Sequence, residues 1–399
     1  MRIFHEDGGN AMPRIPLHHR RLLRLLCYVF VPLILLYILV VYEPVPLLQF
    51  PHSQQKIDYD AHPTYEYTSL YRQKADLAFE HALEEKLLAL ERDITSQLPD
   101  EYEDLDAHLA IWQLTTPEVA GAVRTWTQQW KDNNADWVYN LLTSPPTDLY
   151  QIFKNIPEIG AMNEAAQDIQ DDLTRYILLW YNGGFYTDVE TWDRVPLRSC
   201  KPMAQLVQTK QDQEISLMIG VETDEPYLST TQLRKWGWGR GFAFGQSSIW
   251  ATMRFDPILR KAIVRTISHS RTQRMSAKED WIQTAKNRLW GGNSEEVSGR
   301  GMLTDLVLEV LSESLSEDHE MRDRDAGLER RVTWKKFRAL KETVWMNVKH
   351  VKEGSEENMR GLAVLPVNVW YNGQTHSRSG SFEHPDACVN HIPKIRTNN

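Results

Sequence analysis

One stretch, from residue 164 to residue 196, constrains the fold more than any other. Its first half predicts a helix whose apolar residues share one face: Ile169, Leu173, Tyr176, Ile177 and Trp180. The helix should end at the Gly183-Gly184 pair, because glycine is the usual residue after a helix C-terminus. The alternating segment that follows is typical of a short strand, and two acids, Asp188 and Glu190, come at its end.

The two acids stand where an α/β protein binds ligands. In an open α/β sheet, ligands bind at the carboxyl ends of the strands. Side chains two residues apart point to the same side of a strand, so Asp188 and Glu190 can converge if the strand continues. If the chain turns there instead, both can line the turn. Paired carboxylates suit a hard cation such as Mn²⁺ or Mg²⁺, which could neutralise a departing diphosphate.

An Asp-x-Glu pair alone is weak evidence, since such pairs are common on solvated turns. The preceding helix, the two glycines, the aromatic Phe185-Tyr186 pair and Pro196 give this pair its weight.

Strands and helices alternate around this stretch. The segments 108–117 and 136–145 read as strands, with helical spacing between them, and the helix 164–182 follows. This order predicts a parallel sheet with flanking helices. Further strands are expected at Leu217–Asp224 and in "LAVLPVNVWY", residues 362–371. Residues 256–270 are expected to form an amphipathic helix, and the small apolar segment 242–253 suits a chain that passes under a ligand.

The N-terminal region predicts a membrane anchor. Residues 25–42 contain no charged side chain and are long enough to cross a bilayer. Four arginines between residues 14 and 24 precede the run, and no Lys or Arg follows it until Lys56, so the bias of positive charge places the N-terminus in the cytoplasm. A cleaved signal peptide is the rival interpretation, but no small-x-small cleavage site follows the run.

The rest of the chain divides into a stem and a large domain. We predict a cytoplasmic tail at 1–24, the anchor at 25–42, a stem region with one helix at 43–100 and a luminal domain at 101–399. The stem helix, Ser69–Gln97, could pack on the domain or pair with a partner stem, and its single apolar stripe favours packing on the domain. The charged segment at about 311–332 is expected to be a surface insertion.

Charge and cysteine content exclude several classes of function. A net charge of −9 argues against a nucleic-acid partner. The three cysteines, Cys27, Cys200 and Cys388, include no Cys-x-x-Cys pair, which excludes a zinc ribbon or a thioredoxin-type centre. Cys200 and Cys388 could form a disulfide in an oxidising compartment, or both could remain thiols.

Several motifs, in order, resemble glycosyltransferase family 32, the fungal initiation-specific α-1,6-mannosyltransferase group. The main match is "DDLTRYILLWYNGGFYTDVE", from Asp171 to Glu190. The others are "IWQ" at 111–113, "IGVETD" at 219–224, "SGRGMLTD" at 298–305 and "CVNH" at 388–391. Their order and spacing are more specific than any one of them.

The resemblance implies a fold, a reaction and a location. The fold would be GT-A-like, with a Rossmann-like mixed sheet and flanking helices, after a single N-terminal transmembrane helix. The protein would be a single-pass type II Golgi membrane enzyme that uses Mn²⁺ (or Mg²⁺). It would transfer a hexose, mannose from GDP-mannose in α-1,6 linkage, to an N-glycan or another glycan acceptor with retention of configuration. A complex with other Golgi mannosyltransferases would also fit.

The resemblance assigns roles by position. Asp188 and Glu190 match the DXD metal ligands and act in catalysis, and His391 matches a late residue that closes on the metal. Asp305 matches a catalytic acid in the acceptor half. Residues in the main motif match the positions that hold the donor: Asp172, Arg175, Tyr186, Gly183 and Gly184.

Simpler roles compete with several of these assignments. Arg175 could form a surface ion pair with Asp172, Tyr186 could be a core residue, and Asp305 could be an ordinary acid in the first turn of a helix. His391 could lie on the surface. His376, in a Gly/Ser-rich loop with Arg378, could help bind an anion.

Two departures from the family pattern keep a second class of function open. Glu190 replaces the second Asp of the DXD motif, and the chain ends in "IPKIRTNN" after His391. A catalytically weak subunit of a transferase complex would have the same fold and anchor. A same-fold transferase that uses a UDP-sugar or a sphingolipid acceptor is a further alternative.

Overall fold

The computed structural model describes residues 70–97, 109–143, 147–208, 215–236, 238–279, 293–323, 331–355 and 357–391. The predicted tail and anchor at 1–42 lie outside these ranges. Within the ranges, no helix has both the length and the hydropathy that a membrane crossing requires.

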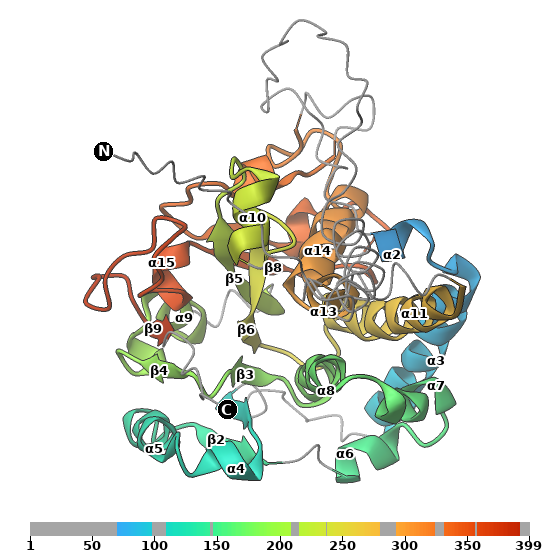
Figure 1. The fold of residues 1–399 in the computed structure, drawn as a ribbon, viewed down its shortest axis with the longest axis horizontal. Helices are drawn as coiled ribbons and strands as arrows, with labels where there is room; N and C mark the ends of the chain where they lie inside the picture. Colours follow the sequence, from blue (N-terminus) through green and yellow to red (C-terminus); the bar gives the residue numbers. More distant parts are fainter. Residues whose placement is uncertain are drawn as a thin grey trace, which may run out of the picture. The chain divides into compact units, whose positions relative to one another are not determined.

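The described residues form a mixed α/β fold around a central sheet (Figure 1). The strand order is β2-β1-β3-β6-β5-β8-β7. The strands are β1 (Ala110–Leu114), β2 (Val138–Leu142), β3 (Gly184–Thr187), β5 (Leu217–Asp224), β6 (Phe242–Ala251), β7 (Val344–Met346) and β8 (Leu362–Leu365). β4 (Thr191–Asp193) and β9 (Val389–His391) pair separately. The predicted α/β architecture is confirmed, with a sheet that is mixed.

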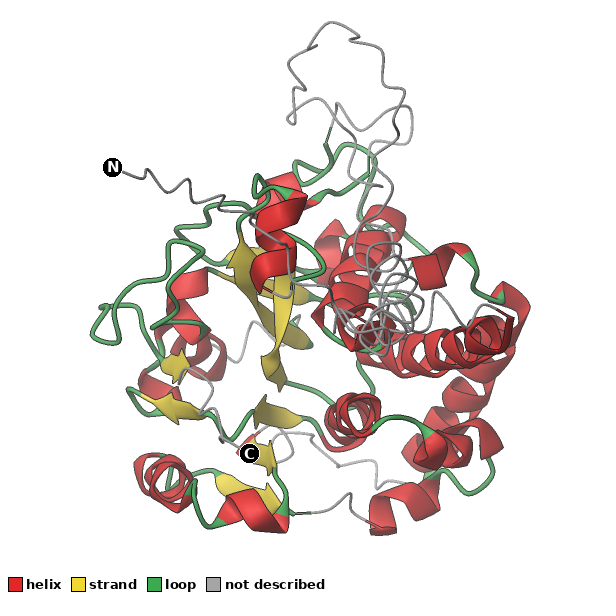
Figure 2. Ribbon diagram, viewed as in Figure 1, coloured by secondary structure: helices red, strands yellow, loops and turns green. Residues whose placement is uncertain are grey.

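Helices surround the sheet (Figure 2). The α-helices are α2 (Leu70–Gln73), α3 (Leu77–Ser96), α4 (Pro117–Ala120), α5 (Arg124–Asn133), α6 (Thr147–Ile152), α7 (Pro157–Gly160), α8 (Gln167–Asn182), α9 (Lys201–Gln208), α10 (Thr230–Trp236), α11 (Pro257–Glu279), α13 (Asn293–Val297), α14 (Arg300–Ser314) and α15 (Val367–Trp370). Short 3-10 helices cover Ala161–Glu164, Leu197–Ser199, Trp334–Phe337 and Val348–His350.

Strand direction places several loops at one edge of the sheet. β1 runs parallel to β2 and β3, and β5 runs parallel to β8. β3 and β5 both pair antiparallel with β6, so they run in the same direction. The carboxyl ends of β1, β2, β3, β5 and β8 therefore share one edge, and the segment after β3 with both acids starts from it. We call this the carboxyl edge.

The helix-to-strand turn forms as the sequence predicts. α8 ends at Gly183, which has a φ of 70° and donates its N–H to the Leu179 carbonyl at 2.8 Å. Gly184 has a φ of 96°, and a Cβ there would lie 2.7 Å from the Ala110 carbonyl oxygen. The Trp112 indole N–H donates to the Gly183 carbonyl at 3.0 Å. Only glycine fits this turn, because its conformation and its close contact with β1 both exclude a side chain.

The helix predicted at 256–270 forms as part of α11, but its polar side chains do not face water. Residues 257–270 of α11 are buried on nearly all sides, including the arginines Arg260 and Arg265. Arg260 pairs with Glu84 and Glu91 of α3, at 3.4 and 3.2 Å. The polar stripe of α11 therefore faces the acids of a neighbouring helix instead of water.

The stem helix packs on the domain, as the sequence favoured. α3 buries Leu83 and Leu87, which are 1% and 0% exposed, and both belong to the core cluster. Its ion pairs to Arg260 hold the other side of the contact. Each buried leucine contributes about 1.5–3 kcal/mol, so α3 belongs to the folded domain and the predicted break at residue 100 does not separate it.

The charged segment at 311–332 also differs from the prediction. Leu311 and Leu315, at and after the end of α14, are both 0% exposed. The buried Arg322 donates to the carbonyls of Ser312 and Leu315. The described part of this segment packs on the domain because a few apolar residues and one arginine anchor it.

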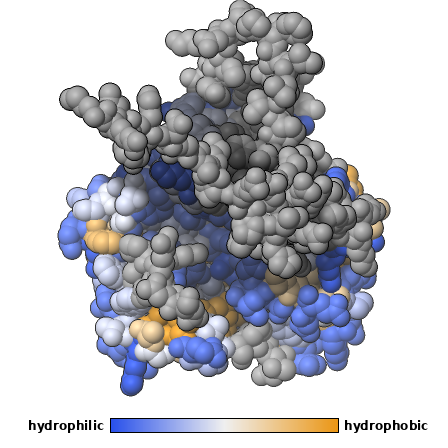
Figure 3. All heavy atoms as spheres, in the orientation of Figure 1, coloured by the Kyte–Doolittle hydropathy of each residue, from blue (hydrophilic) through white to orange (hydrophobic). Residues whose placement is uncertain are grey.

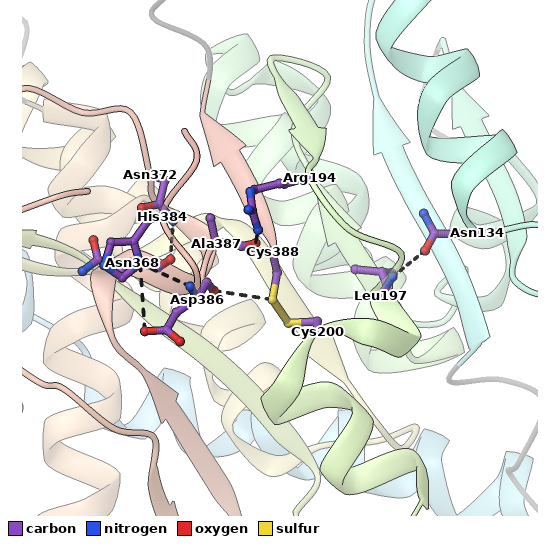
Figure 4. The surroundings of a disulfide bond; sticks show 10 residues. All are labelled: Asn134, Arg194, Leu197, Cys200, Asn368, Asn372, His384, Asp386, Ala387 and Cys388. Atoms are coloured by element: carbon purple, nitrogen blue, oxygen red, sulfur yellow. Dashed lines mark hydrogen bonds and ion pairs between the residues drawn. A yellow bond between two sulfur atoms is a disulfide. The ribbon is translucent and has the colours of Figure 1, made fainter. Parts of the chain in front are cut away.

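A disulfide joins Cys200 to Cys388 (Figure 4). Cys200 directly precedes α9, and Cys388 directly precedes β9. The backbone N–H of Cys388 donates to Val369 at 2.8 Å, and its carbonyl accepts from Arg194 at 2.8 Å. The disulfide and these bonds hold β9 against β4, which follows the Asp188–Glu190 segment.

Candidate functional site

Arg175 is the centre of a buried polar network at the carboxyl edge. Its side chain donates to Asp172 at 2.6 Å, to the Tyr186 hydroxyl at 3.3 Å and to Asp188 Oδ1 at 3.2 Å. Tyr186 itself donates to Asp188 Oδ1 at 2.9 Å. Arg175 and Asp172 are only 5% and 6% exposed, so this is not the surface ion pair of the simpler interpretation.

Local structure brings these four residues together. Asp172 and Arg175 lie one turn apart on α8, and Tyr186 and Asp188 lie two residues apart on the extended chain. The glycine turn folds β3 back beside the helix. The Arg175 guanidinium then stacks over the Tyr186 ring, 4.6 Å from its centroid.

The network fixes the charge of its central residue. Burial acts to lower the pKa of Arg175, but Tyr186, Asp188 and Asp172 outweigh it and hold this pKa well above its ordinary value. Burial raises the pKa of Tyr186, so its hydroxyl keeps its proton and serves as a donor to Asp188. Among the described residues, the buried Nε of Arg175 has no hydrogen-bond partner.

Ser298 completes the surroundings of Asp172. Its hydroxyl donates to Asp172 Oδ2 at 2.7 Å, so both carboxylate oxygens are held. The Tyr176 hydroxyl bonds to the Ser298 carbonyl and to Gln246, each at 2.9 Å. The sequence analysis gave Ser298 no role, although it begins one of the quoted motifs.

The chain turns after β3, so Asp188 and Glu190 line a turn and do not sit on a continuing strand. The Asp188 N–H donates to Ser247 at 2.9 Å. The Asp188 carbonyl accepts from Gln113 at 3.1 Å and from the Thr191 hydroxyl at 2.6 Å. The sequence analysis did not single out Gln113 or Ser247, which fix the backbone of the turn. The Asp188 side chain is 33% exposed, and Glu190 is partly exposed.

Strand pairing brings His391 to the same turn. In the antiparallel pair of β4 and β9, His391 lies opposite Thr191, the residue after Glu190. The His391 N–H donates to the Asn372 carbonyl at 3.1 Å, which holds β9 from its other side. The backbone of His391 thus lies beside the turn that carries Asp188 and Glu190, although 201 positions separate Glu190 from His391 (391 − 190).

These residues fit a divalent cation that shares its ligands with a donor molecule. Carboxylate oxygens suit Mg²⁺ and Mn²⁺, and an imidazole suits a transition metal. Within the described ranges, hydrogen bonds reach only Oδ1 of Asp188, which leaves Oδ2 for a cation. The same ranges contain no group of three or more His, Cys, Asp or Glu side chains arranged as a complete metal site. Phosphate oxygens would have to supply further ligands.

Asp305 does not join this network. It pairs with Arg240 at 2.6 Å, and Arg240 also pairs with Glu296. Arg240 is 5% exposed. Burial acts to lower the pKa of Arg240, but Asp305 and Glu296 raise it well above the ordinary value. The described contacts of Asp305 are those of a structural ion pair between α14 and the start of β6.

The two glycines predicted to bind the donor lie elsewhere. Gly183 and Gly184 stand at the amino end of β3, away from the carboxyl edge where Asp188 lies. Gly184 is in close contact with β1. Both residues shape the turn, and the donor contact assigned to them stays a prediction.

In the loop around His376, two groups that could bind an anion contact carboxylates of the chain. Arg378 pairs with Asp224, and the Ser377 N–H donates to Glu225 at 2.7 Å. Its cationic and N–H groups are thus engaged by carboxylates of the chain itself. Burial, Arg300 and His391 lower the pKa of His376 to about 4, so its ring is neutral at physiological pH.

Comparison with known proteins identifies the region that contains the network. Residues 121–214 match the family described as glycosyltransferase sugar-binding region containing DXD motif. The initiation-specific alpha-1,6-mannosyltransferase of Candida albicans is 22% identical over 221 residues, which cover 54% of this chain and 55% of the relative. The HOC1 protein of Saccharomyces cerevisiae is 26% identical over 238 residues, which cover 58% and 53%. The chain thus spans about half the length of the curated relatives that it matches.

A solved structure, the PaToxG glycosyltransferase, is 12% identical with a TM-score of 0.31 and covers 59% of this chain and 80% of its own. A likeness this low carries no argument about fold or function. The other matches confirm the resemblance inferred from the sequence motifs, and they support a glycosyltransferase. Residues 121–214 of this chain therefore resemble a glycosyltransferase sugar-binding region containing a DXD motif, and about half of the chain is similar to a fungal mannosyltransferase.

Proposed function

We propose that this protein transfers a hexose from a nucleotide sugar to a glycan acceptor, with mannose from GDP-mannose and an α-1,6 linkage as the first choice. One observation carries the proposal. Arg175 joins Asp172 and Tyr186 to Asp188 in a buried network at the carboxyl edge, inside the matched sugar-binding region. The relatives supply the sugar and the linkage, which apply to this chain only as part of the proposal.

Each residue of the network has a task in such a reaction. Arg175 and Ser298 hold Asp172, whose carboxylate can accept a hydrogen bond from a hydroxyl of the bound sugar. Arg175 is permanently charged, and its buried Nε can meet a donor oxygen. Asp188, Glu190 and His391 would hold Mn²⁺ or Mg²⁺. When bound, the cation would supply positive charge that stabilises the departing diphosphate. Asp305 has no task in this scheme beyond its ion pair.

The proposal also covers the fold family and the location. A mixed sheet with the site at its carboxyl edge fits a GT-A-like domain. Residues 25–42 would anchor the protein in the Golgi membrane as a single-pass type II protein, with 1–24 cytoplasmic, 43–100 containing the stem and 101–399 luminal. The exact stem boundary would move, because α3 packs on the domain.

One residue favours a second candidate, a catalytically weak subunit of a transferase complex. Glu190 takes the place of the second Asp in the DXD motif, and its side chain is one methylene longer. A longer carboxylate can shift the cation away from the Asp188 side. The weak subunit and the active enzyme have the same fold, so turnover separates them.

The test is a screen of the full-length protein in detergent against a panel of nucleotide sugars, with Mn²⁺ and with EDTA. We expect metal-dependent hydrolysis of GDP-mannose, because water can replace the acceptor. A UDP-sugar as the hydrolysed donor would correct the sugar assignment and leave the reaction class intact. If no donor is hydrolysed and none raises the melting temperature, the enzymatic proposal is wrong.

Replacing Asp188 tests the role of the turn. Asp188→Asn keeps the shape of the side chain and removes its charge, so we expect a loss of at least about 100-fold in Mn²⁺-dependent hydrolysis. Asp168→Asn, an exposed acid in the first turn of α8, is the control and should keep wild-type activity. Equal activity of the two variants would contradict a metal role for Asp188.

A further inference from the structure

An aromatic cluster lies outside the network that the proposed function uses. Trp236 ends α10, Trp238 follows two residues later, and His376 comes from the loop after α15. The two indole centroids are 4.8 Å apart, and the Trp238 and His376 centroids are 4.4 Å apart. Both pairs meet nearly at right angles, at 75° and 81°.

Trp236 is exposed to solvent although it belongs to this cluster. Its exposed fraction is 41%, and it is among the few large apolar side chains of the described ranges with so much exposure. The described surface in the view of Figure 3 is mostly hydrophilic, with a few separate hydrophobic patches. An exposed indole that packs against other rings is typical of a binding surface.

A backbone hydrogen bond and a neighbouring arginine hold the Trp238 side of the cluster. The backbone N–H of Trp238 donates to the Leu233 carbonyl at 2.9 Å, and the Arg300 guanidinium lies 5.6 Å from the Trp238 ring centroid. Arg300 in turn is fixed by Glu222 at 3.2 Å and by Glu295 at 2.7 Å. Side chains that are already held in one conformation lose little conformational entropy when a ligand binds to them.

The cluster stands at the carboxyl edge of the sheet. α10 follows β5, whose carboxyl end shares this edge with the end of β3. The Asp224 N–H at the end of β5 donates to the Ser377 hydroxyl at 2.8 Å, which places the loop of His376 at this edge. In the sheet order, β5 and β1 lie on opposite sides of β3 and β6. The cluster is therefore on the side away from the parallel β1–β2–β3 half.

The chemistry of the cluster suits a neutral sugar. The C–H groups of a hexose ring pack on an indole face, and its hydroxyls bond to a neutral imidazole or a carboxylate. Glu222 and Glu295 pair with the Arg300 guanidinium, and Asp224 pairs with that of Arg378, so a phosphate would meet negative charge there. This excludes the diphosphate of a donor as the preferred ligand.

We propose that Trp236, Trp238 and His376 form the binding platform for a neutral hexose of the acceptor glycan. The exposed Trp236 stacks on the sugar ring, and Trp238 and His376 hold Trp236 in place. That the sugar is the acceptor, and not a product or a regulatory ligand, rests on the proposed function. The geometry of the platform does not depend on it.

The experiment measures sugar binding and donor hydrolysis separately, in full-length protein in detergent. Saturation-transfer NMR with α-1,6-mannobiose reports binding, and Mn²⁺-dependent hydrolysis of GDP-mannose reports the donor site. The variants are Trp236→Ala, Trp236→Phe and the control Trp126→Ala, a partly exposed tryptophan on α5. Melting temperatures verify that each variant is folded.

We expect Trp236→Ala to lower the saturation signal at least fivefold and to leave the kcat and KM of hydrolysis unchanged. Trp236→Phe should restore most of the signal, and Trp126→Ala should match the wild type. The proposal is overturned if Trp236→Ala binds mannobiose as well as the wild type does, or if the wild type shows no signal. It is also overturned if Trp236→Ala abolishes donor hydrolysis. If the wild type binds mannobiose but hydrolyses no donor, the enzymatic proposal fails and the sugar platform stands.

Discussion

At the scale of single residues, the buried charge of Arg175 holds helix α8 and the turn after β3 together. Its guanidinium carries several donors in a fixed plane, and three acceptors on two elements surround it. A buried arginine is costly unless its charge is compensated, and here Asp172 and Asp188 compensate it. The consequence is that helix α8 and the turn after β3 keep one fixed relative position.

The neighbouring acids Asp171 and Asp172 on α8 give a matched pair of variants. Asp172 is buried against Arg175 and Ser298, whereas Asp171 accepts an exposed hydrogen bond from Gln167. We expect Asp172→Asn to lower donor hydrolysis about 100-fold or more, since it weakens the contact that holds Arg175. Asp171→Asn should change the rate less than twofold. Steady-state kinetics measure both, and similar losses would argue for a general effect on the helix.

Asp193 gives a prediction about pH. It is fully buried beside Asn134, and burial raises its pKa to about 6 although the hydrogen bonds from Asn133 and Asn134 oppose this. Between the ordinary value of 3.8 and about 6, the folded state keeps a proton that the unfolded state has lost. Stability from this residue therefore falls as the pH rises through that window and stays low above it.

Asp193→Asn removes this loss of stability at higher pH, because an amide does not ionise. We expect the variant to be more stable than the wild type at pH 7.5 by on the order of 1–3 kcal/mol, and the difference to shrink toward pH 4. Thermal unfolding at several pH values measures it, with Asp168→Asn as the exposed control. A difference that does not depend on pH would contradict the assignment.

At the scale of elements, β9 is a short strand on which the site depends. It has three residues, it forms a two-stranded sheet with β4, and it carries His391. So short a pair is weak in isolation. The disulfide from Cys388 to Cys200 therefore holds β9 in place and also stabilises the whole fold.

Cys388→Ser tests both the stability of the fold and the position of β9. Because the disulfide links residues 188 positions apart, its loss should cost about 2–4 kcal/mol of stability. Freeing β9 should also raise the Mn²⁺ concentration needed for half-maximal hydrolysis, while saturating Mn²⁺ restores the rate. Cys27→Ser is the control. An unchanged Mn²⁺ requirement would show that β9 keeps its place without the disulfide.

At the scale of the whole molecule, the boundary of the folded domain lies before α3. Leu83 of α3 is buried in the core, and Leu77 of the same helix is 62% exposed. Leu83→Ala should cost about 2–4 kcal/mol, and Leu77→Ala should cost less than about 0.5 kcal/mol. Chemical denaturation measures both.

The same reasoning applies to a fragment that begins at residue 98. Such a fragment would leave the core under α3 open and Arg260 without its acids, so it should be much less stable than one that begins at residue 66. Equal denaturation midpoints of the two fragments would contradict the placement of α3 in the domain.

The sequence alone determined the elements whose signals are local. The helix with the glycine C-cap, the short strand, β5 at Leu217–Asp224 and the position of Asp188 at a strand end all follow from periodicity and from glycine. The family motifs within residues 121–214 were visible for the same reason, since they lie in one continuous stretch.

Only the tertiary structure decided which distant side chains meet. Arg260 is buried because acids of α3 face it, and Ser298 reaches Asp172 across 126 positions. The pairing of β4 with β9 and the Trp236–His376 cluster depend on contacts that leave no periodic pattern in the chain. Periodicity reports whether a residue faces water or protein within its own element, but it carries no information about the partner that another element brings.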